Sequence, residues 1–223
     1  MRAAAPRAGG LRHGWLVAGL VVLGAVWIGP LPEWSRQSFA SHMLMHMGVV
    51  AVAAPLIAVG LARSRFDPAR RWPGWFAPMV ASALEFVVVW AWHAPALHHA
   101  ARHVPGLLLV EQGSFLLVGL LVWIAAFGGD DARRHDRAAA GVAGLLMTSM
   151  HMTLLGVLLA LASRPLYTGH VAFDNAIFGL SPLQDQHWGG VLMLVFGGAS
   201  YLVGALVLLA GLLRDRRGWV ADG

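Results

Sequence analysis

The sequence contains no cysteine, so the chain forms no disulfide, no thiolate metal site and no redox-active cysteine pair. Any bound metal ion must therefore be held by histidine, methionine, carboxylate or backbone oxygen. Histidine and methionine are both plentiful, with 11 and 9 residues respectively. The absence of cysteine thus narrows a metal site to imidazole, thioether and oxygen ligands.

Charged residues are also scarce: 12% of the chain is charged and 58% is hydrophobic, with a mean hydropathy of +0.65. Soluble domains carry about 25% charged residues, so this composition excludes an ordinary soluble domain. Lysine is absent, and the net charge of +5 comes from arginines that mostly lie between long apolar runs. This distribution favours a membrane topology over a nucleic-acid interface, and we expect no nucleic-acid partner.

Long apolar runs make up most of the remaining sequence, and six of them approach the about 20 residues that a transmembrane helix requires. The fold class we predict is an all-α polytopic membrane protein, a six-transmembrane-helix bundle surrounded by membrane lipid. Residues 1–223 form one transmembrane domain in this prediction. The spans are expected at about residues 13–28, 39–61, 75–93, 106–127, 138–162 and 187–213.

Arginine sets the expected orientation, because basic residues near the ends of spans remain on the cytoplasmic side. Most arginines lie in the N-terminal segment, the second and fourth loops and the C-terminal segment, so both termini are predicted to be cytoplasmic. The last helix is expected to start before the bilayer, since Ser181, Pro182 and Gln184 form a capping-box start. That start places Asp185 and His187 in its first two turns.

The densest chemical signal is the segment S-H-M-L-M-H-M at residues 41–47, on the outer side of the second span. His42 and His46 are four residues apart and share one helix face, with Met43 and Met45 on either side of it. Imidazole and thioether both suit copper, and thioether favours Cu(I). The simpler alternative is that the methionines pack a helix interface and the histidines bond to neighbouring helices.

The fifth span offers a complementary group, Met150 and His151, at a depth similar to that of His46. These residues are expected to face one another, with His93, Asp185 and His187 at the mouth of the same cavity. Interfacial anchoring of His93 and helix capping by Asp185 are the alternatives. The candidate metal ligands are His42, Met43, His46, Met47, His93, Met150, His151, Asp185 and His187.

The remaining titratable residues of the outer side are interpreted as solvated. Glu111 is expected to be interfacial and hydrated. Glu85 is deeper in its span, so it should be protonated, paired or facing a wet path, which makes it a candidate for proton or cation transfer. Nothing resembles a nucleophilic triad, a phosphate-binding loop or a pair of hydrolase carboxylates, so no enzymatic activity is expected. The histidines expected at the wet surface are His98, His99, His103 and His170.

Four segments in order resemble the CtaG-like family of cytochrome c oxidase assembly factors. They are His42–Met47 running to Ala54–Leu56, Trp92–Leu97, Glu111–Leu116 with Trp123, and Asp185–Gly190 ahead of Gly197, Gly198 and Tyr201. The resemblance implies a role in supplying copper to the oxidase, an oxidase subunit as partner, and a bacterial-type inner (plasma) membrane as location. His187 stands where relatives show a second glutamine, and the added methionines would strengthen a copper site.

The leading hypothesis is a non-enzymatic assembly factor in which His42, His46 and His151 hold copper near the outer leaflet. Soft methionines would relay the ion, namely Met43, Met47 and Met150. One alternative is a b-type haem protein with His46 and His151 as axial ligands. Two others are a copper transporter coupled through Glu85 and a scaffold that binds oxidase subunits without metal.

Overall fold

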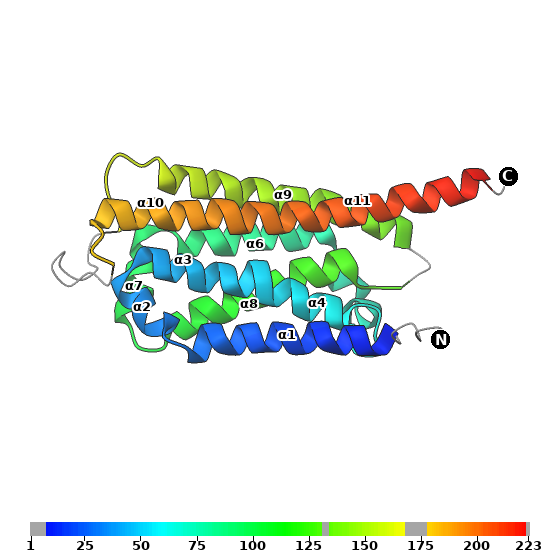
Figure 1. The fold of residues 1–223 in the computed structure, drawn as a ribbon, viewed down its shortest axis with the longest axis horizontal. Helices are drawn as coiled ribbons and strands as arrows, with labels where there is room; N and C mark the ends of the chain where they lie inside the picture. The colour runs from blue at the N-terminus through cyan, green and yellow to red at the C-terminus, as the bar shows by residue number, and fades with distance from the viewer. Residues whose placement is uncertain (1–7, 131–133, 168–177, 222–223) are drawn as a thin grey trace, which may run out of the picture.

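The computed structural model describes residues 8–130, 134–167 and 178–221 as an elongated bundle of helices lying side by side (Figure 1). Within these ranges the chain is helical and contains no strand, which confirms the all-α prediction. The helices in chain order are α1 Ala8–Ile28, α2 Leu31–Gln37, α3 Phe39–Met47, η1 Gly48–Ala53, α4 Ala54–Leu61, α5 Pro68–Arg71, η2 Pro73–Trp75, α6 Pro78–Trp92, α7 Pro95–His103, α8 Leu107–Phe127, α9 Arg134–Ala160, α10 Pro182–Leu192, η5 Met193–Gly197 and α11 Gly198–Ala221.

Five continuous ranges among the described residues are long and apolar enough to cross a membrane, which makes this a multi-pass membrane protein. They coincide with the regions expected for the first, second, fourth, fifth and sixth spans. Their bounds are Gly10–Ile28, Phe39–Leu61, Leu107–Phe127, His135–Ala160 and Pro182–Arg214.

The region of the expected third span, residues 75–93, is shorter and is followed by a bend. Its helix α6 has 15 residues, which span about 22 Å, less than the about 30 Å of a bilayer core. The chain then turns by 71° into α7. The turn falls at Ala94, whose ψ is 129°, because the ring of Pro95 drives the preceding residue out of the helical region.

The first and last spans show how α6 contributes to the topology. α1 begins and α11 ends at the same end of the bundle, on the right in Figure 1. A chain arranged in this way runs along the bundle an even number of times, and α6 with α7 is the candidate for a sixth span beside the five longer ones. The short helices α2 and α7 lie at the opposite end, which we call the α7 end.

The second span is interrupted by η1, a π-helical turn, and the cause is Pro55. The Ala54 N–H donates to Val49 O, five residues back, instead of to Val50 O. Pro55 has no N–H, so the next residue cannot supply the missing donor to Val50 O. A π turn inside an α-helix leaves such carbonyls free for other partners.

Side chains from two other helices bind the carbonyls that this turn releases. Trp123 on α8 donates its indole N–H to Val50 O at 3.0 Å, and the hydroxyl of Tyr201 on α11 lies 3.4 Å from the same oxygen. Ser200 Oγ donates to Ala51 O at 2.7 Å. The π turn therefore joins the second span to α8 and α11 in the middle of the bundle.

Glycines let α9 approach the last span at backbone distance. A Cβ on Gly190 would lie 2.5 Å from the backbone nitrogen of Ala160, and one on Gly156 would lie 2.7 Å from that of Leu194. Small residues allow this kind of contact between membrane helices. Gly190 of α10 and Gly156 of α9 thus serve a close contact between these two membrane helices.

Candidate metal centre

Asp185 fixes the start of α3, the helix that carries His42 and His46. Its carboxylate accepts hydrogen bonds from Ser38 Oγ (2.7 Å), Phe39 N (2.6 Å) and Ala40 N (3.1 Å). A carboxylate at a helix N-terminus satisfies free N–H groups and opposes the positive end of the helix dipole. Asp185 therefore caps α3 and not its own helix, α10, where the predicted capping box at Ser181 is confirmed.

Four histidines converge at the α7 end of the bundle, and we call them the histidine cluster. His42 and His46 come from α3, His93 from the end of α6 and His98 from α7. The ring centroids lie 4.8 Å apart for His42 and His98, 5.5 Å for His46 and His93, and 6.2 Å for His42 and His93. All four side chains are buried. Three helices thus bring imidazoles of three different segments to one place.

Several ring nitrogens of the histidine cluster have no hydrogen-bond partner among the described residues. They are Nε2 of His93 and both nitrogens of His42 and His46. His93 Nδ1 lies 2.6 Å from Val89 O, and because a carbonyl can only accept, Nδ1 carries the proton and Nε2 presents its lone pair. Buried polar atoms normally have partners, so this concentration of imidazole nitrogens without hydrogen bonds makes the histidine cluster the candidate ligand site.

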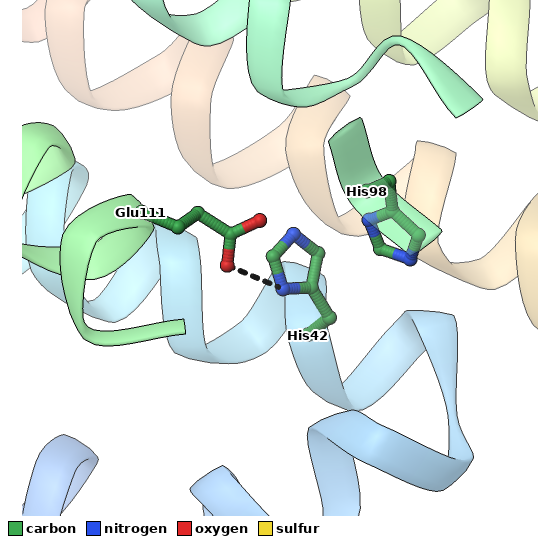
Figure 2. A group of neighbouring side chains, drawn as sticks. All are labelled: His42, His98 and Glu111. Atoms are coloured by element: carbon green, nitrogen blue, oxygen red, sulfur yellow. Dashed lines mark ion pairs between the residues drawn. The ribbon is translucent and has the colours of Figure 1, made fainter. Parts of the chain in front are cut away.

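A buried ion pair borders the histidine cluster. Arg102 on α7 donates from Nη2 to both oxygens of Glu111 on α8, at 2.8 and 2.7 Å. Glu111 Oε2 also lies 3.8 Å from His42 Nδ1. His42, His98 and Glu111 place one potential ligand atom each within 4.8 Å of one another (Figure 2). The group offers two imidazoles and a carboxylate whose charge Arg102 balances.

Aromatic rings enclose the histidine cluster. Phe115 lies 3.9 Å from the ring of His46, centroid to centroid, and Phe39 stacks on Tyr167 at 4.3 Å. The Tyr167 hydroxyl donates to the backbone carbonyl of His93 at 2.8 Å. Burial raises the pKa of Tyr167, so this hydroxyl remains a neutral donor. The apolar surroundings keep water away and strengthen electrostatic interactions inside the cluster.

The methionines next to His42 and His46 face a different neighbour. Met43 and Met47 are buried against the last span, near the backbone of Gly189 and Gly197 respectively. Each is one residue beyond a histidine, which turns its side chain by about 100° on the helix. Met150 on α9 is 67% exposed on the side of the bundle. Met43 and Met47 therefore pack against the last span, and Met150 lies on the surface of the bundle.

The other expected ligands lie outside the histidine cluster. The His151 ring is buried and packs against Phe86 at 5.4 Å, and this is its one ring contact among the described residues. His187 pairs its Nε2 with Ala162 O at 2.9 Å, which fixes the start of α10 against the end of α9. His170 lies outside the described residues. The structure thus joins His42, His46 and His93 but does not bring His151 to them.

Two expectations about the outer residues are wrong. His98 is buried in the histidine cluster instead of solvated, and Glu111 is buried in an ion pair instead of hydrated. Both result from the bend before Pro95, which folds α7 over the end of the bundle. A sequence signal existed: His98, Ala101 and Arg102 occupy one face of a short helix and are buried together.

Glu85 forms a separate buried polar group in the middle of the bundle. Tyr201 donates its hydroxyl to Glu85 Oε1 at 2.5 Å, and Ser82 and Thr148 share a hydrogen bond of 2.8 Å beside it. Glu85 was expected to be protonated, paired or facing a wet path, and in the structure it is paired with Tyr201. This group joins α6, α9 and α11.

The fold and this site define a polytopic helical membrane protein with a buried histidine cluster near one end of its bundle. The chain belongs to the cytochrome c oxidase caa3 assembly factor family, Caa3_CtaG, whose family model matches residues 1–215. This confirms the resemblance found in the sequence motifs. No curated protein and no solved structure matches the chain.

Proposed function

We propose that this protein assists cytochrome c oxidase assembly by binding copper in the histidine cluster and passing it to an oxidase subunit. Membership of the assembly-factor family supports the oxidase as the destination and a non-catalytic role. The observation that carries the copper part is the set of buried imidazole nitrogens without hydrogen-bond partners on His42, His46 and His93. The arginine bias of the loops argues that the α7 end faces the outside of the membrane.

The chemistry of the donor set fits copper. Imidazole is a good ligand for copper, and neutral His93 already presents a lone pair at Nε2 because its Nδ1 bonds to a carbonyl. Arg102 and Glu111 balance each other, so a bound ion brings its own net charge into a buried site. Burying one charge costs less than burying two, which favours Cu(I) over a divalent ion.

The arrangement gives the other residues supporting roles in this proposal. His42, His46 and His93 are the ligands, and Asp185 holds α3 so that its two histidines face the cluster. Met47, one residue beyond His46, packs against Gly197 of the last span. His151 and Met150 take no part. A haem held by His46 and His151 has no support in this geometry, since Phe86 packs against the ring of His151.

The experiment that tests the proposal is the metal content and visible spectrum of the detergent-purified protein, expressed with copper and haem available. We expect near-stoichiometric copper, no Soret band, and loss of the copper in a His42→Ala/His46→Ala double variant. The matched control is His13→Ala/His135→Ala, which removes two exposed histidines from α1 and α9. Unchanged copper in the His42→Ala/His46→Ala variant, or a Soret band in the wild type, would overturn the proposal.

A further inference from the structure

The helix α7 carries histidines on both of its faces. His98 and Arg102 lie on the buried face, in the histidine cluster and in the ion pair with Glu111. His99 and His103 lie on the exposed face, four residues apart. The exposed pair takes no part in the histidine cluster or in the ion pair.

The two exposed rings contact each other and serve no packing role. The centroids of His99 and His103 lie 4.2 Å apart with an interplanar angle of 46°. Among the described residues, neither ring has another aromatic, ionic or hydrogen-bond partner. Two imidazoles that share a helix face at this spacing can both reach one metal ion, as the histidines of an H-x-x-x-H metal motif do.

The exposed pair lies next to the histidine cluster along the chain, so it is placed to supply metal ions to the buried site. His99 directly follows His98, whose ring lies 4.8 Å from that of His42. His98 and His99 are consecutive residues, so their side chains are turned by about 100° from each other around the α7 axis. Arg102 anchors α7 to Glu111 through two hydrogen bonds, so the helix that carries the exposed pair is fixed next to the histidine cluster. A metal ion held by His99 and His103 therefore lies about a quarter turn around α7 from His98.

We propose that His99 and His103 form a second, solvent-facing metal site that captures copper and delivers it around α7 to His98 and the histidine cluster. This inference rests on the proposed function, because it assumes that the cluster is the destination. The ion keeps one oxidation state throughout, so no reductant is required. Two imidazoles leave further coordination positions to water, which makes the surface site weaker and faster to exchange than the buried one.

The test compares the stoichiometry and rate of copper loading in the detergent-solubilised full chain. The probe is Cu(I) presented by a competing chelator under anaerobic conditions. Wild-type protein should bind a tight and a weak equivalent. The His99→Ala/His103→Ala variant should lose the weak equivalent and load the tight one at least about tenfold more slowly, because the local supply of ions is gone. The control is again His13→Ala/His135→Ala, which should load as the wild type does.

The outcomes separate this inference from the proposed function. If the His99→Ala/His103→Ala variant loads at the wild-type rate with the wild-type stoichiometry, the capture site is refuted and the buried site stands. If the His42→Ala/His46→Ala variant keeps the tight equivalent, the proposed function fails. Loss of the tight equivalent with the weak one retained in that variant supports two separate sites. Thermal unfolding of every variant checks that the bundle is intact.

Discussion

Replacing Arg102 by glutamine should make the protein hold copper more tightly while it becomes less stable. Arg102 is 7% exposed and gives two hydrogen bonds to Glu111. Removing one partner of a buried ion pair costs about 3–5 kcal/mol of stability, because the other charge is left uncompensated. The metal-free variant should therefore unfold at a clearly lower temperature than the wild type.

The same change should raise the affinity for a cation. Glu111 Oε2 lies 3.8 Å from His42 Nδ1, and without Arg102 its charge is available to an ion at that nitrogen. Two opposite unit charges about 4 Å apart attract by about 4 kcal/mol at an effective dielectric constant of about 20. Since about 1.4 kcal/mol is a factor of ten, the gain in affinity approaches about 1,000-fold.

The assay is a Cu(I) competition titration combined with thermal unfolding in the presence and absence of copper. Copper should raise the unfolding temperature of Arg102→Gln more than that of the wild type, because tighter binding stabilises the folded state. The double variant Arg102→Gln/Glu111→Gln removes both charges and should lose the gain in affinity. A folded Arg102→Gln protein with unchanged or weaker copper binding would refute a copper ion at His42 Nδ1, beside Glu111.

Three further substitutions test the packing that positions this centre. Asp185→Asn keeps the size but weakens the cap of α3, so the free energy of unfolding should fall by about 1–2 kcal/mol, whereas exposed Asp130→Asn should have little effect. Gly190→Ala places a Cβ against the backbone of α9 and should cost about 1–3 kcal/mol, while Gly113→Ala meets open space and should not destabilise. Tyr201→Phe removes the donor to a buried carboxyl and should cost about 1–3 kcal/mol. Thermal or denaturant unfolding in one detergent measures all three. Equal effects of Asp185→Asn or Gly190→Ala and its control would contradict these packing roles, as would unchanged stability of Tyr201→Phe.

The sequence was sufficient to predict where most helices cross the membrane, because long apolar runs and their ends are local properties. The second span was expected at residues 39–61, and Phe39–Leu61 is one of the continuous membrane-spanning ranges. The third was harder to place, since α6 is short and the chain bends at Ala94. A proline shows that a helix ends, but it does not show that the following helix returns over the bundle.

The candidate site was only partly predictable for the same reason. The spacing of His42 and His46 fixes their common face within one helix. Whether His98 joins them depends on the bend between α6 and α7, which is a tertiary property. For His151, the sequence gives the depth along α9 but not the direction of the side chain. That direction depends on how α9 is rotated about its axis, and the ring faces Phe86.

The π turn at Gly48–Ala53 has a consequence for the histidine-bearing half of the second span. Such a turn is equivalent to one residue inserted into an α-helix, so it offsets the two halves of the span by about 100° around the axis. One half presents His42 and His46 to the cluster, and the other places Gly60 against the backbone of Leu16 on α1. A helical wheel drawn through all of residues 39–61 would therefore misplace these two surfaces by about 100° around the helix axis. Deleting the single residue Val52 would remove this offset and rotate the imidazoles away from their partners.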